Sequence, residues 1–374
     1  MTPLPLAALM LSVLQQPRPA IRVDQPNATL RAEFSDIRGI REIGGGRVVI
    51  VDYRDQRVVV GDFARGDVAV MARTGSGPAE VRLPMSLVPL SGDSLGVADY
   101  GNQRLLVLDP AGRPARTIPG DRPGQLGVRG LDRTGAWYYT IPAWVERDRA
   151  LPNDSVRLVR WEPASGAERR VATVQGDRMR SDIRKPSRVP RIPTVGYARR
   201  DGWLPAADGL WIVRGDRYRV EWHPTGKPPV VGPAYGIETP AVTPQDRIAY
   251  VKEFNATSPM SGRGEDGGMG FSPGMSDAET AAMAAGTEFA THHPDFSPGR
   301  LHLDAEGQLW VGVVTPGAPT TRYDRFDTTG RRTGSLTLPA DRRIAAFGRG
   351  ALYAIRTTDD GLQYVERYAL SLQN

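Results

Sequence analysis

The chain has 374 residues, of which 40% are hydrophobic and 24% are charged, and this is enough apolar material for a packed core. Its 42 glycines and 32 prolines disfavour a bundle of long helices. The absence of cysteine excludes a disulfide framework, a thiolate metal site and a cysteine nucleophile, and four histidines leave little room for a histidine-rich metal centre.

The formal net charge is +6, and only three of the 48 basic residues are lysines. Acidic and basic residues are interleaved along most of the chain, so we expect no nucleic-acid partner. The main exception is segment 178–200, which has eight basic residues and one acidic residue. This segment could meet an anionic ligand or a lipid surface, or it could be a solvated connection.

The N-terminus carries an uncharged apolar run at residues 3–14, which has the length of the hydrophobic part of a signal peptide. It is too short to span a bilayer, and no later segment approaches 18 uninterrupted apolar residues. We therefore expect residues 1–20 to be a signal peptide or a disordered tail. We also expect an exported protein, periplasmic or extracellular, without a transmembrane segment.

A repeat follows, because segments 41–62 and 88–109 superpose without a gap. Each contains two strand-like runs joined by a tight turn, which predicts a hairpin. Both segments have an aspartate at the end of the first run and an arginine at the start of the second: Asp52 and Asp99, then Arg57 and Arg104.

Weaker copies of the hairpin complete a set of six. They pair 135–143 with 156–162, 209–214 with 218–223, 308–314 with 322–327, and 351–358 with 363–370. A further strand precedes each hairpin, and another follows all but the last. Six four-stranded units around an axis predict an all-β, six-bladed β-propeller, a single domain over residues 28–371.

The last blade lacks an outermost strand because the chain ends. Residues 28–34 have a strand-like pattern and lie just before the first blade. We therefore expect this N-terminal segment to pair with the outer edge of the last blade and to close the ring without a covalent bond.

One stretch of the second unit, 97–106, resembles the NHL repeat, in which an aspartate, a turn asparagine and an arginine recur at this spacing. The matching residues are Asp99, Asn102 and Arg104, and Asp52 and Arg57 echo them one blade earlier. The chain as a whole resembles bacterial six-bladed β-propeller proteins. This resemblance implies a fold and not a reaction.

We interpret these aspartates and arginines as structural, with the carboxylates accepting hydrogen bonds from turns and the arginines packing over strands. No nucleophile with a partnered histidine is visible, so we assign no catalytic residue. We predict no cofactor and no metal site.

An insertion at 237–296 separates the fourth and fifth blades. Thr243 followed by Pro244 predicts the start of a helix that continues to about residue 254. Ser276 and Glu279 form a capping-box pattern before an alanine-rich run to about residue 290. Between the helices, residues 259–274 are rich in glycine and proline and should form a loop.

Three long connections between strands indicate where a ligand would bind. Segments 144–155, 175–194 and 237–296 should all emerge on the face that carries the turns between the second and third strands, and such clustering is typical of a binding surface. The candidate binding residues are Trp144, Arg147, Arg191, His292, His293 and Asp295.

We therefore expect a monomeric recognition or scaffold propeller that binds a peptide, a protein or a glycan on this face. The alternative is a hydrolase or lyase resembling propeller lactonases, with a divalent ion such as calcium or zinc in the central channel.

Overall fold

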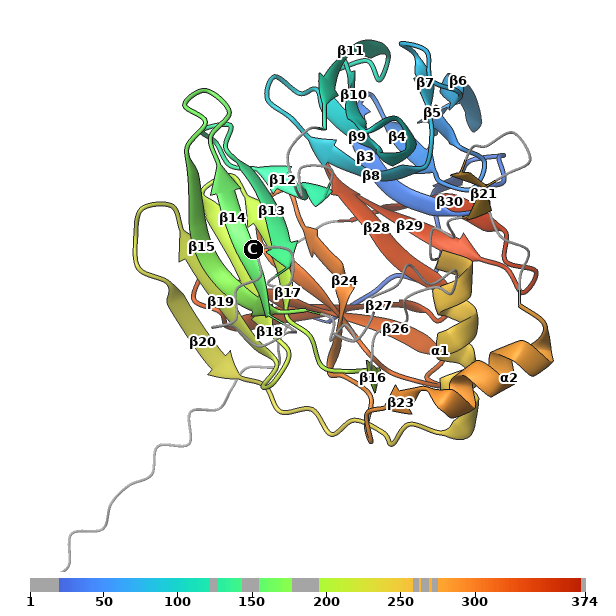
Figure 1. The fold of residues 1–374 in the computed structure, drawn as a ribbon, viewed down its shortest axis with the longest axis vertical. Coiled ribbons are helices and arrows are strands. Elements are labelled where there is room, and N and C mark those ends of the chain that lie inside the picture. The colour runs from blue at the N-terminus through green and yellow to red at the C-terminus, as the bar shows by residue number, and fades with distance from the viewer. Residues whose placement is uncertain are drawn as a thin grey trace, which may run out of the picture.

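The computed structural model describes residues 20–120, 127–142, 155–176, 195–257, 262–263, 269–270 and 275–370. Six antiparallel sheets follow one another around a common centre, in the order of the sequence (Figure 1). The protein is an all-β six-bladed propeller, as predicted. We letter the strands of each blade A to D from the centre outward.

The first three blades have strands A to D in chain order. Blade 1 contains β3 (Ile37–Gly44), β4 (Arg47–Asp52), β5 (Arg57–Asp62) and β6 (Asp67–Thr74), and β7 (Glu80–Val81) pairs with β6 at its edge. Blade 2 contains β8 (Pro84–Pro89), β9 (Leu95–Asp99), β10 (Arg104–Leu108) and β11 (Pro114–Pro119), with a 3-10 turn at Tyr100–Asn102. Blade 3 contains β12 (Gly130–Leu131), β13 (Trp137–Pro142), β14 (Ser155–Trp161) and β15 (Glu168–Gln175).

The last three blades repeat this order. Blade 4 contains β17 (Gly202–Ala206), β18 (Gly209–Arg214), β19 (Arg219–Pro224) and β20 (Val230–Ala234). Blade 5 contains β24 (Phe296–Leu303), β25 (Leu309–Val313), β26 (Thr320–Phe326) and β27 (Arg332–Pro339). Blade 6 contains β28 (Arg342–Gly348), β29 (Ala351–Thr357) and β30 (Gln363–Ala369).

Burial explains why the B strands read as continuous apolar runs. Every residue of β9 and of β25 is buried, because both faces of a blade pack against neighbouring blades. The outer strands β6 and β20 are largely exposed. Six hydrophobic clusters lie between successive blades, each containing residues of two neighbours, such as Trp211 with Val311 and Trp310 with Leu352.

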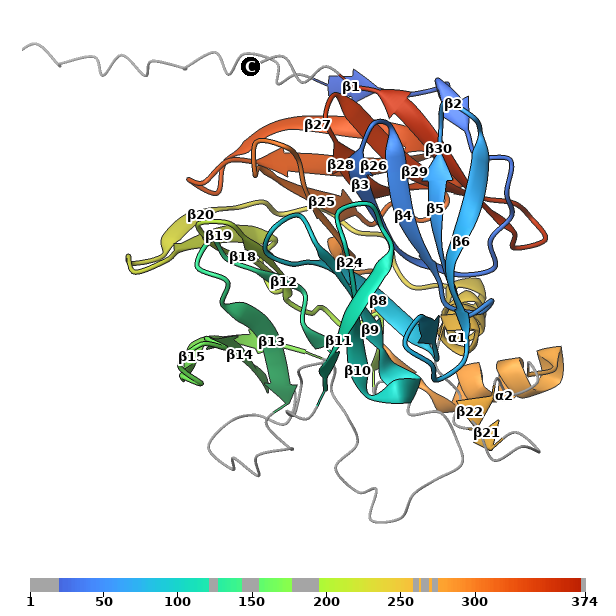
Figure 2. The ribbon, with the colours of Figure 1, turned by 90° about the horizontal axis from the view of Figure 1, so that it is seen from above.

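The N-terminal segment closes the ring at the predicted edge. Strand β2 (Ala28–Thr29) pairs antiparallel with β30, and Phe34 makes an isolated bridge to Gln363 (Figure 2). The predicted pairing partner is confirmed, but the predicted seven-residue strand is wrong in length. Between these points the chain turns toward blade 1, where the Arg31 N–H donates to the carbonyl of Gly66.

This arrangement makes the segment a clasp between the last blade and the first. Leu30 and Phe34 are 0% and 1% exposed, and they pack in the cluster that blades 6 and 1 share. A further strand was not predicted from the sequence: β1 (Ala20–Arg22) lies parallel to β27 and extends blade 5.

The insertion contains the two predicted helices. Helix α1 (Pro244–Thr257) begins after Thr243, and helix α2 (Asp277–Gly286) has the expected capping box between Ser276 and Glu279. Helix α2 ends earlier than the predicted residue 290, because the chain becomes extended at Thr287 and forms β23 (Glu288–Phe289), which pairs with β16 (Val195–Gly196). Two short strands, β21 (Gly262–Arg263) and β22 (Met269–Gly270), lie within the predicted loop.

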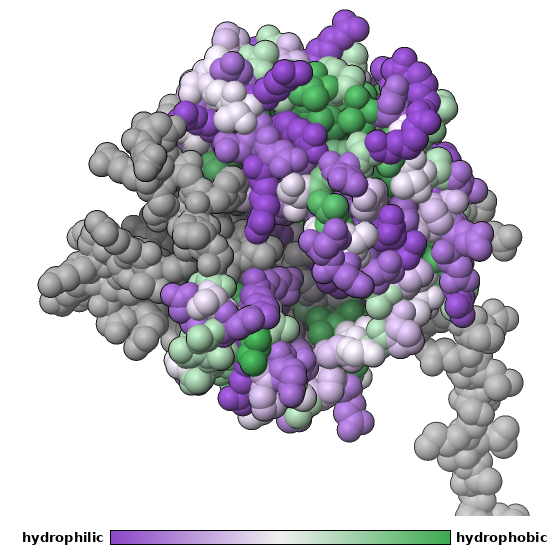
Figure 3. Space-filling model, turned by 90° about the vertical axis from the view of Figure 1, so that its right-hand side faces the viewer, coloured by the Kyte–Doolittle hydropathy of each residue, from purple (hydrophilic) through white to green (hydrophobic). Residues whose placement is uncertain are grey.

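The side of the molecule that carries α2 is mixed in character. Its coloured residues form small, separate hydrophobic patches among hydrophilic ones (Figure 3). No helix among the described residues is long and apolar enough to cross a membrane.

Candidate functional sites at two faces

Antiparallel strands divide the loops of a propeller between two faces. The A–B and C–D turns lie on one face, and the B–C turns and blade connections lie on the other. A pocket is present on each face. We call them the insertion pocket, on the face with the B–C turns, and the arginine channel, which opens among the A–B turns.

The insertion pocket has a volume of about 590 Å³ and lies against helix α1. The B–C turn of blade 5 supplies Val314 to Ala318, and the connection into blade 4 supplies Tyr197 and Arg200. Aromatic rings and prolines make much of its wall: Tyr197, Tyr250, Phe254, Phe296, Pro294, Pro298 and Pro316. Charges of both signs, from Asp246, Glu253, Arg200 and Arg300, surround this apolar surface.

His293 lies in the wall of this pocket and is 2% exposed. Its ring centroid is 4.5 Å from that of Tyr197, and its Nε2 lies 3.2 Å from Oδ2 of Asp246. Asp246 also accepts hydrogen bonds from the backbone and hydroxyl of Thr243 at the start of α1. The Thr243 hydroxyl, Thr243 N–H and His293 together lower the pKa of Asp246. His293 therefore links α1 to the segment that leads into β24.

Tyr197 links α1 to the connection that leads into blade 4. Its hydroxyl donates to the carbonyl of Asp246 at 3.0 Å, and its ring packs edge-on against Tyr250. Burial, with the nearby charges of Asp246 and Glu253, raises the pKa of Tyr197 to about 12. The phenol thus stays protonated and keeps its donor at any physiological pH.

Of the other predicted binding residues, Asp295 and His292 flank His293 in the chain, and three lie outside the described residues. Asp295 is buried, and its Oδ2 lies 3.6 Å from Nη2 of Arg199, whereas His292 is exposed. Burial raises the pKa of Asp295, and Arg199 opposes this. Trp144, Arg147 and Arg191 lie outside the described residues.

The repeated aspartates and arginines lie at the B–C turns of blades 1 and 2. Asp99 is 0% exposed, and its carboxylate accepts hydrogen bonds from Arg104 Nε at 2.8 Å and Asn102 Nδ2 at 2.8 Å. Arg104 also donates to the carbonyls of Gly77 and Glu80, which fixes the linker between the blades.

The equivalent pair in blade 1 is made the same way. Arg57 Nη2 lies 3.1 Å from Oδ2 of Asp52, which is also 0% exposed, and the same nitrogen donates to the carbonyl of Glu33. Through these contacts Arg57 and Arg104 stabilise the turns and the segments that connect neighbouring blades.

A second kind of Asp–Arg pair, not identified from the sequence, occurs at the A–B turns of blades 3 and 5. Asp132 accepts from Arg160 Nε at 2.8 Å, and Asp304 accepts from Arg325 Nε at 2.9 Å. Both aspartates also accept from backbone N–H groups of their own turns. In these blades the Asp–Arg pair lies on the face opposite to that of the pairs in blades 1 and 2.

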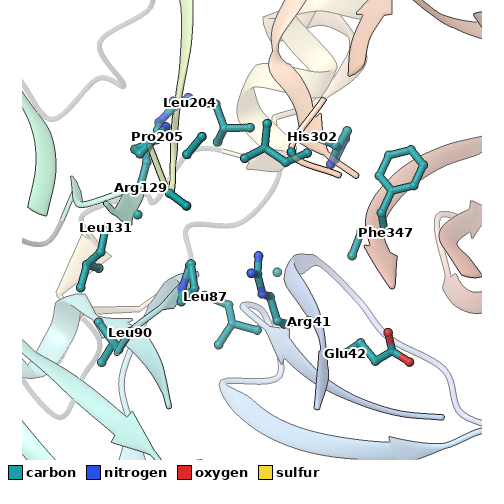
Figure 4. A pocket seen from close by; sticks show the side chains of 18 of the residues that line it. Arg41, Glu42, Leu87, Leu90, Arg129, Leu131, Leu204, Pro205, His302 and Phe347 are labelled. Carbon is teal, nitrogen blue, oxygen red and sulfur yellow. The ribbon is translucent and has the colours of Figure 1, made fainter. Parts of the chain in front are cut away.

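The arginine channel is the larger pocket, with a volume of about 860 Å³, and the A strands of all six blades line it. Arg41 on β3 extends into the cavity, while Glu42 on the same strand points aside (Figure 4). Arg129, Leu204, His302 and Phe347 surround the space from other blades (Figure 4).

The channel arginines were missed because each occurs singly in its own strand. The available signal was an arginine in or just before an innermost strand: Arg41 in β3 and Arg129 just before β12. Among the described residues, no group of three or more histidines or carboxylates could hold a metal ion.

Comparisons with known proteins show the fold and no more. No protein-family model matches the chain, and no curated protein matches it. A protein of Bacteroides fragilis, provisionally assigned as exported, matches with 9% identity over 94% of this chain and 100% of its own, at a TM-score of 0.51.

Two further solved structures are more distant in shape. The calcium-binding protein regucalcin from Agrobacterium tumefaciens matches with 14% identity, a TM-score of 0.43 and coverage of 95% of this chain and 99% of that one. Virginiamycin B lyase from Staphylococcus aureus matches with 12% identity, a TM-score of 0.40 and coverage of 92% and 88%.

Proposed function

We propose that this protein is an exported, non-catalytic recognition propeller that binds a peptide segment of a partner protein in the insertion pocket. The observation that carries the proposal is the pocket itself. Helix α1 and the B–C turn of blade 5 enclose about 590 Å³ of space lined by aromatic rings and prolines. Such walls suit the apolar side chains and prolines of an extended peptide.

The charges around the pocket support a peptide over a ligand of a single charge. Asp246 and Glu253 lie on α1, Arg200 lies in the connection into blade 4 and Arg300 lies on β24, so the lining carries charges of both signs. A peptide with polar groups of both kinds can satisfy this arrangement.

Export rests on two observations. The apolar run at residues 3–14 has the length of a signal-peptide core, and the similar Bacteroides protein is provisionally assigned as exported. Expression with the native N-terminus, followed by N-terminal sequencing of the secreted or periplasmic protein, tests this part. Cleavage near residue 20 is the expected result, and an intact cytoplasmic chain would contradict it.

The alternative, a propeller hydrolase or lyase with a divalent ion in the channel, fits the channel poorly. Arg41 and Arg129 face the cavity, and their positive charges oppose the binding of a calcium or zinc ion. Metal analysis of the purified protein tests this alternative, and a stoichiometric divalent ion would favour it.

Binding to peptide and glycan arrays tests the proposed function. Ala318→Trp places a large ring at the rim of the insertion pocket, and Thr328→Trp places the same ring on an exposed C–D turn of the same blade. We expect retained peptides to lose at least tenfold in affinity with Ala318→Trp and to be unaffected by Thr328→Trp. Equal binding by both variants would contradict the proposal, and retention of glycans alone would replace the peptide with a glycan.

A further inference from the structure

The arginine channel contains more positive charge than its acidic residues neutralise. Two arginines that line it, Arg41 on β3 and Arg129 just before β12, contact no carboxylate in the described part of the chain. The Arg129 guanidinium donates to the carbonyl of Trp203 at 3.4 Å and lies 5.0 Å from the centroid of that residue's ring. The side chain of Arg41 has no hydrogen bond to any residue that the structure describes.

The acidic side chains that line the channel are already engaged. Asp132 and Asp304 accept from Arg160 and Arg325, as described above. Glu42 accepts from the backbone N–H of Arg349 at 2.7 Å and points away from Arg41 (Figure 4). The carboxylates that line the channel therefore do not neutralise Arg41 and Arg129.

These two arginines are open to a ligand that enters the channel. Both side chains are exposed to water within it. The surrounding walls lower the pKa of Arg41 and Arg129, although an arginine remains protonated at neutral pH. A bound anion would therefore meet two positive charges that no carboxylate neutralises.

The channel also has an apolar wall. Leu87, Leu90, Leu131, Leu204 and Phe347 face the same space as Arg41 (Figure 4). A volume of about 860 Å³ with apolar walls and a few charged groups falls in the range typical of small-molecule sites. An inorganic ion alone would leave this wall in contact with water.

We propose that the channel binds a small organic anion, a carboxylate or phosphate ester attached to an apolar group, with Arg41 and Arg129 holding the anionic group. The planar guanidinium groups offer paired N–H donors that match carboxylate and phosphate oxygens. The leucines and Phe347 cover the apolar part. This site is separate from the insertion pocket and does not depend on the proposed function.

Calorimetric titration of the full-length protein at low ionic strength tests the proposal, because salt screens such contacts. The probes are phenyl phosphate, benzoate, inorganic phosphate and the neutral benzamide. We expect phenyl phosphate or benzoate to bind at least tenfold more tightly than both inorganic phosphate and benzamide. Failure of both aromatic anions to bind at 10 mM, or equal binding of benzamide, would overturn the proposal.

Substitutions locate the site. Arg41→Met removes the charge and keeps a long side chain, and it should weaken binding of the aromatic anion at least tenfold. Arg41→Lys retains a charge without the paired donors and should fall between Arg41→Met and the native protein. The matched control is Arg217→Met, an exposed arginine that pairs with Asp216 away from the channel, and it should bind as the native protein does.

The melting temperature and a crystal structure distinguish a lost ligand contact from misfolding of the variant. The melting temperature of Arg41→Met should be close to that of the native protein, because the Arg41 side chain makes no hydrogen bond with the described residues. A crystal structure with phenyl phosphate should place the phosphate beside Arg41 and Arg129. Native-like affinity in a folded Arg41→Met variant, or a phosphate bound in the insertion pocket, would contradict the assignment.

Discussion

The arginine channel and the insertion pocket lie on opposite faces of the propeller and differ in how their charged side chains are paired. In the wall of the insertion pocket, His293 lies against Asp246, and Arg199 lies close to Asp295 nearby. In the channel, neither Arg41 nor Arg129 contacts a carboxylate in the described part of the chain. The comparison shows that Asp246 and Asp295 have basic partners within the protein, whereas these two channel arginines have no acidic partner among the described residues.

The same contrast separates two classes of arginine within the blades. Arg104 is fixed by a fully buried aspartate and two backbone carbonyls, so its loss removes structure. Arg41 has no such partner, so its loss should remove affinity instead. The predictions below test this difference, from the largest expected effect to the smallest.

Removing the N-terminal clasp should have the largest effect, because both pockets require a closed ring. Deletion of residues 1–34 removes Leu30 and Phe34, which are almost fully buried between blades 6 and 1. Loss of two such side chains costs about 5 kcal/mol or more. We expect a large fall in the melting temperature and aggregation through the exposed edge of β30.

Deletion of residues 1–23 is the matched control for the clasp. It removes β1 from blade 5 but leaves the pairing of β2 with β30. We expect a much smaller fall. Equal melting temperatures for the native protein and the longer deletion would show that the clasp does not hold the ring together.

Arg104→Met should destabilise the protein by about 3 kcal/mol, because it leaves the carboxylate of Asp99 buried without its ion-pair partner. Urea denaturation measures this free energy of unfolding. Arg104→Met should leave the affinity of the channel for phenyl phosphate unchanged. A variant as stable as the native protein would remove the distinction between supporting and ligand-binding arginines.

His302 reports on the channel through the pH dependence of stability. Burial, with the charges of Arg343 and Arg300, lowers the pKa of His302 to about 3, against about 6.5 in the unfolded chain. The unfolded state therefore binds the extra proton between these values, and stability falls as the pH drops below about 6.5. At pH 5 the loss is about 2 kcal/mol.

His302→Phe removes this proton binding and keeps a ring beside Tyr323. The variant should show a smaller loss of stability between pH 7 and pH 5 than the native protein, measured by urea denaturation at each pH. Identical pH profiles would mean that His302 titrates normally in the folded protein.

Arg41→Met should have the smallest effect on stability. Because Arg41 is exposed and its side chain makes no hydrogen bond with the described residues, its removal should change the free energy of unfolding by less than about 0.5 kcal/mol. Urea denaturation without added anion checks this. Destabilisation comparable to that of Arg104→Met would place Arg41 among the structural arginines.

Much of the fold could be predicted from the sequence because it repeats local patterns. Alternating turns and apolar runs predicted the blades, and Thr243 and Ser276 predicted the starts of both helices. Strand β1 was not predictable, because its three residues pair with a strand more than 300 positions away. The length of β2 was overestimated, because pattern alone does not show that Arg31 bonds to blade 1.

The candidate sites were harder to predict, for a physical reason. A binding site in a propeller is assembled from one or two residues of each blade, so no single segment carries its pattern. His292, His293 and Asp295 drew attention as a local cluster, yet His293 and Asp295 are buried at the base of the insertion. The channel arginines are informative only when the inner strands of all blades are placed side by side.

The most direct test of the account is the pKa of His302 in the folded protein, measured by NMR. The chain has only four histidines, so their ring resonances can be assigned with a His302→Phe variant. We predict a pKa of about 3 in the free protein and a higher value when phenyl phosphate is bound, because a nearby negative charge favours the protonated ring. An ordinary value near 6.5 in the free protein would contradict the desolvation of His302 in the channel wall, and a value unchanged by the anion would contradict binding of the anion beside it.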